Sequence, residues 1–290
     1  MASMRDIKRR KQSVESTQQI TKAMKLVSTV KLQRAKQRAE QVKTYFQAIY
    51  DTVSSILARS GNINHPYLNA SEGGKKAVIL ITGNRGLAGG YNSNVIKLIS
   101  RDERFSAKDT VIYAVGKKGR DAMKSLGYEI KADYSDVVEE PLFSDAIEIS
   151  KLVLDSFEAG EISEIYLAYT FFKNTVSHEP TLLRLLPVDM AGTREDSALD
   201  KVETKVPMNF EPEDEEALSL IVPKYVTSLI FGGLVEAVAS ENGARMQAMD
   251  SATNNASDII DSLSLQYNRA RQSSITQELT EIIAGADAIS

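Results

Sequence analysis

The stretch that most constrains the fold is the last 67 residues, Lys224 to Ser290, which contain no proline. An uninterrupted helix of this length would extend about 100 Å at 1.5 Å per residue, whereas helices of globular proteins average about a dozen residues. A helix this long cannot be buried in one compact core. The sequence therefore predicts either a partner helix along it or a protein that surrounds it.

Small and apolar residues recur in this stretch at alternating spacings of three and four. They are Met249, Ala252, Ala256, Ile259, Leu263, Gln266 and Ala270, and the spacing resumes at Leu279, Ile282 and Ala286. A narrow seam of this kind is typical of a two-stranded coiled coil, in which small residues let the two backbones approach closely. The alternative is one long helix of an ordinary helical domain.

The first 60 residues are a second stretch without helix breakers, because they contain neither glycine nor proline. Spacings of four and three again separate small or apolar residues, at Ala35, Ala39, Val42, Phe46, Ile49, Val53 and Ile56, and also at Ile20, Met24 and Val27. This pattern predicts a helix of about 80 Å. All seven prolines lie between Pro66 and Pro223, so two long helices are expected to flank a mixed middle and to pair antiparallel.

The middle of the chain alternates short apolar runs with helical patterns. Strands are expected at 77–82, 110–115, 128–132, 164–172 and 181–186, and helices at 92–100, at 120–126 after a turn at 116–119, and at 144–157. This alternation predicts an α/β fold, a doubly wound, Rossmann-like and mostly parallel sheet. The expected organisation is an amino-terminal coiled-coil helix (1–60), the α/β domain (75–190), an acidic connection (191–216) and a carboxy-terminal coiled-coil helix (217–290).

Charge is divided unevenly along the chain. Residues 1–59 hold 13 Lys and Arg against 4 Asp and Glu (+9), residues 60–223 hold 18 against 27 (−9), and residues 224–290 hold 4 against 8 (−4). Attraction between the two arms would explain why the first helix is basic and the remainder acidic. An acidic partner of the basic helix would explain it as well.

A glycine-rich turn, GNRGLAGG (83–90), follows the first expected strand and precedes a helix. Strand, glycines and helix is the arrangement that binds phosphate groups in nucleotide-binding folds. The glycine spacing, however, is neither G-x-G-x-x-G nor that of a P-loop. Tight packing between the strand and the helix is therefore the favoured interpretation.

The sequence lacks the residues that several classes of functional site require. The chain has no cysteine, which excludes disulfides, thiol nucleophiles and Cys-ligated metals, and its two histidines, His65 and His178, are far apart and are expected on the surface. No Ser/His/Asp grouping, metal-ligand spacing or carboxylate pair indicates catalysis. No secretory signal and no membrane span are expected, and we predict no cofactor.

These patterns alone leave two different classes of function open. One is an α/β enzyme with long appended helices, which would bind a phosphate at residues 83–90. The other is a coiled-coil tether or a nucleic-acid binder that uses the basic first helix. No aromatic residues interleave with the basic positions Lys31, Arg34, Lys36 and Arg38, so a solvated helix face is the simpler account.

Three separated segments resemble motifs of one family, the gamma subunit of bacterial F-type ATP synthase. They are QQITKAMKLVSTVKLQRA (18–35), GNRGLAGGYN (83–92) and ITQELTEIIAGADAI (275–289), in the order that the family has them. The resemblance extends over the whole chain. Two positions depart from the family pattern, since Asn84 stands where aspartate is usual and Ala88 where cysteine is frequent.

The resemblance implies a non-catalytic rotor subunit. In that family the terminal helices form an antiparallel coiled coil inside the hexamer of alpha and beta subunits, and the α/β domain contacts the epsilon subunit and the c-ring of Fo. Ion flow turns the ring and the gamma subunit, and this rotation drives ATP synthesis or hydrolysis at the sites of the hexamer. The implied location is the cytoplasmic face of the cell membrane, as a peripheral protein, with no nucleic-acid partner.

The resemblance also implies which residues contact partners. Arg271, Gln272, Thr276 and Glu278 match the positions through which the family contacts beta subunits. Met24 and Lys25 match the zone of the first helix that faces acidic segments of beta, although the spacing also allows Met24 to lie in the seam. Arg245 matches an arginine near the base of the shaft, and an ion pair within the shaft is the alternative for it.

Overall fold

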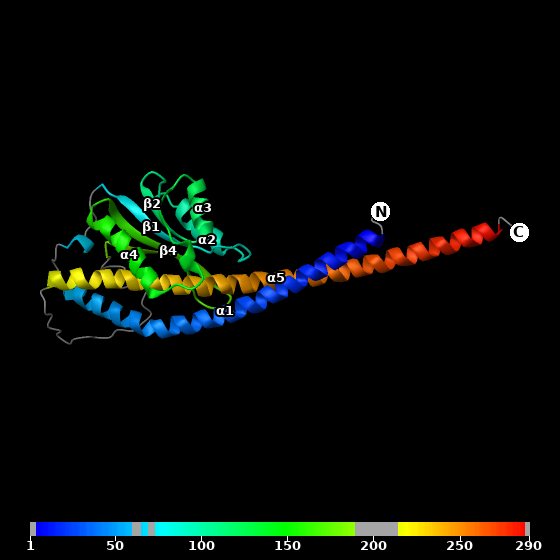
Figure 1. Ribbon diagram of the computed structural model, residues 1–290, viewed down its shortest axis with the longest axis horizontal. Helices are drawn as coiled ribbons and strands as arrows, with labels where there is room; N and C mark the ends of the chain where they lie inside the picture. The colour runs from blue at the N-terminus through cyan, green and yellow to red at the C-terminus, as the bar shows by residue number, and fades with distance from the viewer. Residues whose placement is uncertain (1–3, 60–64, 69–72, 189–213, 288–290) are drawn as a thin grey trace. The chain divides into compact units, whose positions relative to one another are not determined.

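The computed structural model describes residues 4–59, 65–68, 73–188 and 214–287. Its contacts divide the chain into two compact units, one formed by residues 1–29 with 245–290 and the other by residues 30–244. We call them the coiled-coil unit and the α/β unit. Each long helix contributes one half to each unit, so the units cut across the domain ranges expected from the sequence. Figure 1 shows the elements along the chain.

Two helices are far longer than the others. Helix α1 runs over Met4–Arg59 and α5 over Asp214–Asp287, without interruption. Helix α5 begins before the proline-free stretch and contains Pro223 in its interior, where a proline removes one backbone hydrogen bond. The expected acidic connection at 191–216 lies largely outside the described residues. The side chains of the expected seam positions Val42, Phe46, Ile49, Val53 and Ile56 also lie outside them.

The α/β unit contains a five-stranded sheet in the order β3-β2-β1-β4-β5 (Figure 1). Its strands are β1 (Lys75–Ile81), β2 (Thr110–Val115), β3 (Glu129–Asp133), β4 (Ile162–Phe172) and β5 (His178–Leu186). The first four strands are parallel, and β5 pairs antiparallel with β4. The predicted α/β class and the mostly parallel sheet are thus confirmed.

Shorter helices connect these strands. They are α2 (Tyr91–Ser100), α3 (Lys117–Ser125), α4 (Phe143–Glu158), and the 3-10 turns η1 (Pro66–Leu68) and η2 (Ser135–Val138). Strand β1 is buried on both faces, as its continuous apolar run predicts. Val78 and Leu80 pack toward α2 and α3, whereas Ile79 and Ile81 pack toward α4 and the first half of α5. Helix α5 is therefore part of the core of this unit.

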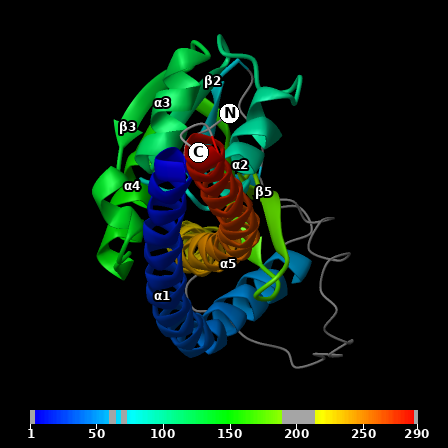
Figure 2. The ribbon, with the colours of Figure 1, turned by 90° about the vertical axis from the view of Figure 1, so that its right-hand side faces the viewer.

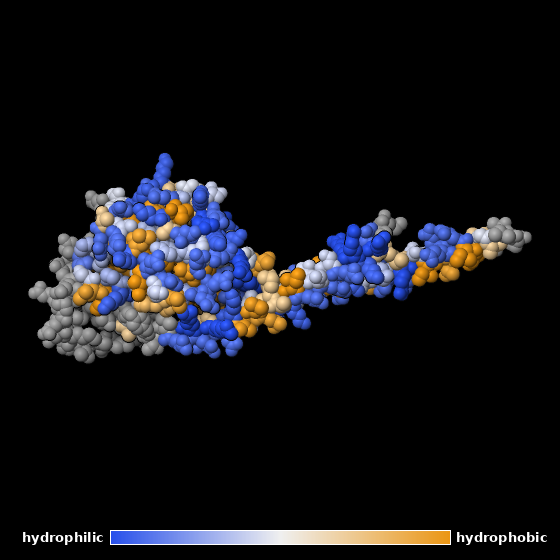
Figure 3. Space-filling view, in the orientation of Figure 1, coloured by the Kyte–Doolittle hydropathy of each residue, from blue (hydrophilic) through white to orange (hydrophobic). Residues whose placement is uncertain are grey.

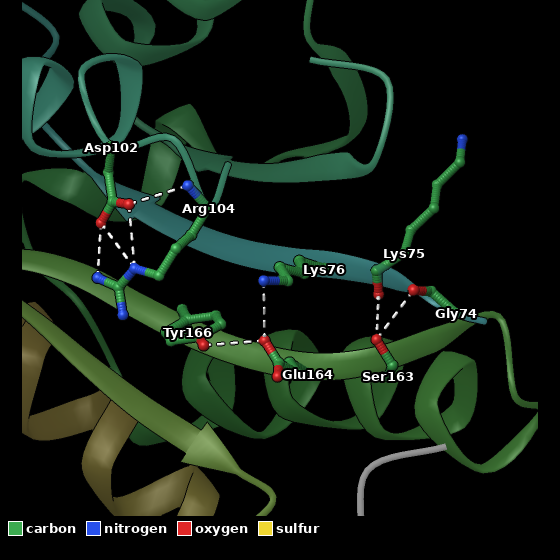
Figure 4. Close-up of polar contacts among 8 residues, drawn as sticks. All are labelled: Gly74, Lys75, Lys76, Asp102, Arg104, Ser163, Glu164 and Tyr166. Carbon is green, nitrogen blue, oxygen red and sulfur yellow. Dashed lines mark hydrogen bonds and ion pairs between the residues drawn. The ribbon is translucent and has the colours of Figure 1, made fainter. Parts of the chain in front are cut away.

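Polar contacts join the amino ends of β1 and β4 (Figure 4). The Lys76 ammonium lies 3.4 Å from the Glu164 carboxylate, which also accepts a hydrogen bond from the Tyr166 hydroxyl at 2.9 Å. The Ser163 hydroxyl donates to the Gly74 carbonyl at 2.9 Å. These contacts lie where the register between the two strands shifts, between Lys75 and Lys76. We interpret this cluster as structural.

One described helix, α5, has a segment that is long and apolar enough to cross a membrane by length and composition alone. Its 18-residue window has a mean hydropathy of 1.6, and 61% of that window is buried inside the protein. A core helix of a protein without membrane spans meets the same criterion. The burial of α5 against the sheet accounts for its apolar character.

Candidate functional site

The coiled-coil unit consists of the first part of α1 and the last part of α5, which lie antiparallel (Figure 2). Three successive pairs cross the seam by polar contacts. Gln18 Nε2 donates to Ser257 Oγ at 2.6 Å, the hydroxyls of Thr21 and Thr253 are 2.8 Å apart, and Lys25 Nζ lies 2.5 Å from Asp250 Oδ1. Hydroxyl, amide and charged groups thus share this part of the seam with the buried Met249 and Ala256.

The seam differs from the predicted stripe in one of its two rows. Met249, Ala256 and Leu263 are buried, as expected. In the second row Ile259 and Gln266 are exposed and the residues after them, Ile260 and Tyr267, are partly buried, whereas Ala252 and Thr253 are both partly buried. Thr253 faces α1 because its hydroxyl meets Thr21, and this rotation leaves Ile259 44% exposed.

Two of the three expected seam positions on α1 in this unit, Ile20 and Val27, are wrong, whereas Met24 is partly buried. Ile20 and Val27 are 57% and 58% exposed, and the buried positions are the residues that follow them, Thr21 and Ser28. Leu26 and Val30 are exposed as well. The coiled coil therefore combines buried apolar residues, such as Met249 and Leu263, with polar residues between its helices, and it leaves several aliphatic residues on its outer surface, where an isolated coiled coil in water would carry polar ones.

The pairing register leaves the end of α5 without α1 beside it. In each crossing pair the two residue numbers add to 274 or 275. On that register Met4, the first described residue of α1, lies opposite about residue 271. Residues 272–287 of α5 form a single helix within this unit, and we call them the overhang.

One face of the overhang is apolar and exposed. Ile275, Leu279, Ile282 and Ile283 are all exposed, Ile282 to 68%. At 100° per residue, these four side chains and those of Arg271, Gln272, Thr276 and Glu278 fall within roughly 160° of the helix circumference. Arg271, Thr276 and Glu278 lie along the two borders of the apolar face, and Gln272 lies within it. Figure 3 shows the apolar atoms along the end of α5.

A family profile and curated relatives match this sequence over nearly its whole length. The ATP synthase family profile matches residues 3–289. The ATP synthase gamma chain of Lachnoclostridium phytofermentans is 65% identical over 291 residues, which cover 100% of both chains. A sodium-ion-specific ATP synthase gamma chain from Acetobacterium woodii is 40% identical over 300 residues, covering 99% of each chain.

The chain belongs to the ATP synthase gamma chain family.

Solved structures show the same fold. A chain of the Euglena gracilis mitochondrial ATP synthase, in a structure titled OSCP/F1/c-ring, superposes with a TM-score of 0.68 at 22% identity, covering 99% of this chain and 94% of that one. A chain of the Tetrahymena thermophila central stalk and c-ring gives 0.58 at 22% identity, covering 80% of this chain and 99% of that one. As a gamma chain, the protein is a stalk subunit of the F1 sector and not a catalytic one.

The predicted contact residues lie at three separate places in the protein. Arg271 directly precedes the overhang, and Gln272, Thr276 and Glu278 lie in its first two turns. All four are exposed, and the Thr276 hydroxyl donates to the Gln272 carbonyl at 2.9 Å. Met24 and Lys25 are partly buried on α1, about six turns from Gln272 along the coiled coil. Arg245 is partly buried at the first position of α5 in the coiled-coil unit.

Lys25 has a partner inside its own chain. Its ammonium group is paired with Asp250, although both side chains remain 40% or more exposed. An ion pair this exposed contributes at most about 1 kcal/mol to stability, so it leaves Lys25 able to exchange partners. The sequence pattern missed Asp250 and Thr253, because a hydrophobic stripe carries no information about polar residues that bond across a seam.

The glycine-rich turn is filled by contacts of the chain itself. The Gly83 N–H donates to Asn92 Oδ1 at 2.7 Å, and Lys118 N–H donates to the Gly83 carbonyl at 3.2 Å. Asn84 bridges two neighbouring segments: its Nδ2 donates to the Ser135 carbonyl at 2.7 Å, and its Oδ1 accepts from Lys117 N–H at 3.0 Å. These contacts favour the packing role over phosphate binding.

We expect Asn84→Ala to lower the free energy of unfolding of the α/β unit by about 1–3 kcal/mol, because the partly buried Ser135 carbonyl and Lys117 N–H would each lose a partner. Chemical denaturation of the purified protein measures this loss. Asn255→Ala, at an exposed position of α5, serves as the control and should stay within about 0.5 kcal/mol of wild type. Equal stabilities of the two variants would show that Asn84 does not join these segments.

Both histidines depart from the expected surface positions. His65 is buried and its Nε2 lies 2.9 Å from Ser219 Oγ. His178, the first residue of β5, is partly buried, and this burial lowers its pKa. Among the described residues no group of three or more His, Cys, Asp or Glu side chains could hold a metal ion.

Proposed function

We propose that this gamma chain is the rotating shaft of its ATP synthase. In this proposal the coiled-coil unit turns inside a ring of alternating alpha and beta subunits, and the α/β unit contacts the epsilon subunit and the c-ring. Ion flow through the c-ring drives the rotation, and the asymmetry of the shaft passes it to the catalytic sites of the ring. The complex would sit at the cytoplasmic face of the cell membrane.

The overhang is the observation that carries this proposal. A single helix with an exposed row of Ile275, Leu279 and Ile282 is unfavourable in water, since each such side chain gains about 1.5–3 kcal/mol on full burial. A surrounding apolar surface removes this penalty without a fixed partner helix. Aliphatic contacts are also non-directional, so they bind without holding the helix at one angle.

The rest of the coiled coil is consistent with enclosure. Its aliphatic side chains Ile20, Val27 and Ile259 are exposed, whereas polar pairs such as Thr21–Thr253 lie between the helices. The two related structures come from assemblies whose titles contain F1, c-ring and central stalk, one of them in a named rotational state. Those assemblies supply the partners that we propose for this chain.

The polar residues have separate proposed roles. Arg271, Gln272, Thr276 and Glu278 would form hydrogen bonds with beta subunits at particular angles of rotation and so define where the shaft pauses. Met24 and Lys25 would meet acidic segments of beta further along the shaft, with Lys25 exchanging Asp250 for a partner carboxylate. Arg245 would stabilise the base of the shaft.

Coexpression with the matching alpha and beta subunits tests the function. We expect a stable complex that contains one copy of this chain and hydrolyses ATP, and a bead attached to the α/β unit should rotate when ATP is added. A chain that elutes alone from size-exclusion chromatography, with ATPase activity independent of its presence, would refute the proposal.

A further inference from the structure

The sheet order creates a crevice that α/β proteins commonly use for ligands. From β1 the chain builds β2 and β3 on one side, then crosses to β4 and β5 on the other side. The strand order therefore reverses between β1 and β4. In open α/β sheets, ligands bind outside the carboxyl ends of the strands at this point.

Two neighbouring residues of α5 lie at the carboxyl ends of these strands. Ser240 is fully buried, and its hydroxyl donates to the Thr170 carbonyl of β4 at 2.9 Å. Thr170 lies opposite Pro180 of β5, which has no N–H to offer. Glu241 is also buried, and its carboxylate lies against Gly83, two residues after the end of β1. A methyl group on Gly83 would be 2.7 Å from Glu241 Oε1.

Glycines on both sides of this pair bring the helix close to the sheet. A methyl group on Gly233 would lie 2.9 Å from Leu167 Cδ2 of β4, and one on Gly243 would overlap the His178 ring at the start of β5. Gly233, Ser240 and Gly243 are spaced by seven and three residues, so they share one face of α5. Contact along this face extends to the last turn of α5 in the α/β unit, which ends at Ala244.

We infer that α5 is anchored in the ligand crevice of its own α/β unit, with the Glu241 carboxylate in the place where such folds hold a phosphate. The glycine turn and the end of β4 are thereby fixed to the helix that continues into the coiled-coil unit. This anchor is where rotation of the α/β unit passes into α5. The transfer of rotation into α5 rests on the proposed rotor function. The contacts of Glu241 and Ser240 with the sheet do not depend on it.

Hydrogen exchange in the assembled complex with alpha and beta subunits tests the anchor itself. In Glu241→Ala we expect the amides of residues 83–86 and 240–243 to exchange about tenfold faster than in wild type, because the contact that holds the turn against α5 is lost. Ser240→Ala, a smaller change, should accelerate exchange chiefly at α5. Glu148→Ala, which removes an exposed carboxylate from α4, is the matched control. Unchanged exchange in both anchor variants would overturn the inference.

Single-molecule rotation of the same complexes tests the transmission of torque. With a bead on the α/β unit, we expect Glu241→Ala to widen the angular fluctuation during each pause about twofold in variance, while Glu148→Ala leaves it unchanged. Equal variances in all three proteins would overturn the torque step. If wild type itself does not rotate, the proposed function fails, and faster exchange in Glu241→Ala would still support the anchor.

Discussion

The double variant Gln272→Ala/Glu278→Ala is expected to reduce ion-driven ATP synthesis about tenfold or more while leaving the fold unchanged. Both residues are exposed on the overhang, beyond the part of α5 that pairs with α1, so neither contributes to the seam. Hydrogen bonds to charged groups contribute roughly 1.5–3 kcal/mol each, and about 1.4 kcal/mol is tenfold in rate. Synthesis in inverted membrane vesicles and thermal unfolding measure the two effects.

The overhang supplies its own matched control. Gln277 and Glu281 have the same side chains, are equally exposed, and hydrogen-bond each other at 2.9 Å. Helix geometry places both on the opposite side from the apolar face. Gln277→Ala/Glu281→Ala should therefore retain most of the synthesis rate. Equal losses in the two double variants would show that no particular face contacts beta, and normal synthesis in Gln272→Ala/Glu278→Ala would remove the proposed roles of those residues.

The strands and long helices were predictable because they depend on local signals. Continuous apolar runs such as 77–82 and 110–115 identify strands covered on both faces, and they match β1 and β2 within two residues. The absence of glycine and proline from residues 1–60 similarly identified α1. The expected carboxy-terminal helix at 217–290 includes Pro223, and the burial of Leu218 and Val222 against the sheet compensates for the hydrogen bond that this proline removes from α5.

The seam of the coiled coil was only half predictable. Spacing located Met249, Ala256 and Leu263, which are small or apolar and buried. Spacing failed for Thr253 and Thr21. Their hydroxyls form a hydrogen bond with each other across the seam, although the two residues are 232 positions apart in the sequence. Pairing of this kind requires knowledge of the register, and a hydrophobic pattern assigns such residues to the solvent. The exposed contact residues on the overhang came instead from the family motif.

Buried charge in the α/β unit was likewise invisible in the sequence. Glu236 lies on α5, and its Oε2 has no hydrogen-bond partner among the described residues. Burial raises the pKa of Glu236 to about 7, while a hydrogen bond from Tyr169 of β4 acts in the opposite direction. Burial and the nearby Glu236 also raise the pKa of Tyr169. A glutamate within a long helix would ordinarily be assigned to its solvated face.

Glu236→Gln is therefore expected to stabilise the α/β unit at alkaline pH. The unfolded carboxyl group titrates near 4.5 and the folded one near 7, so the folded state holds an extra proton between these values. Stability consequently falls as pH rises from about 4.5 to about 7. Above pH 7 the buried charge costs roughly 3 kcal/mol, at about 1.4 kcal/mol per pKa unit. A glutamine at this position has the same shape as glutamate and can still accept a hydrogen bond from the Tyr169 hydroxyl, but it carries no charge.

Chemical denaturation at pH 5 and pH 8 measures this difference. We expect the gain from Glu236→Gln over wild type to be about 2 kcal/mol larger at pH 8 than at pH 5, because most of the titration lies between these values. Glu148→Gln, at an exposed position of α4, should give the same small difference at both pH values. A gain from Glu236→Gln that does not depend on pH would show that the carboxyl group is ionised at both values, and that water or another group compensates its charge within the interface between α5 and β4.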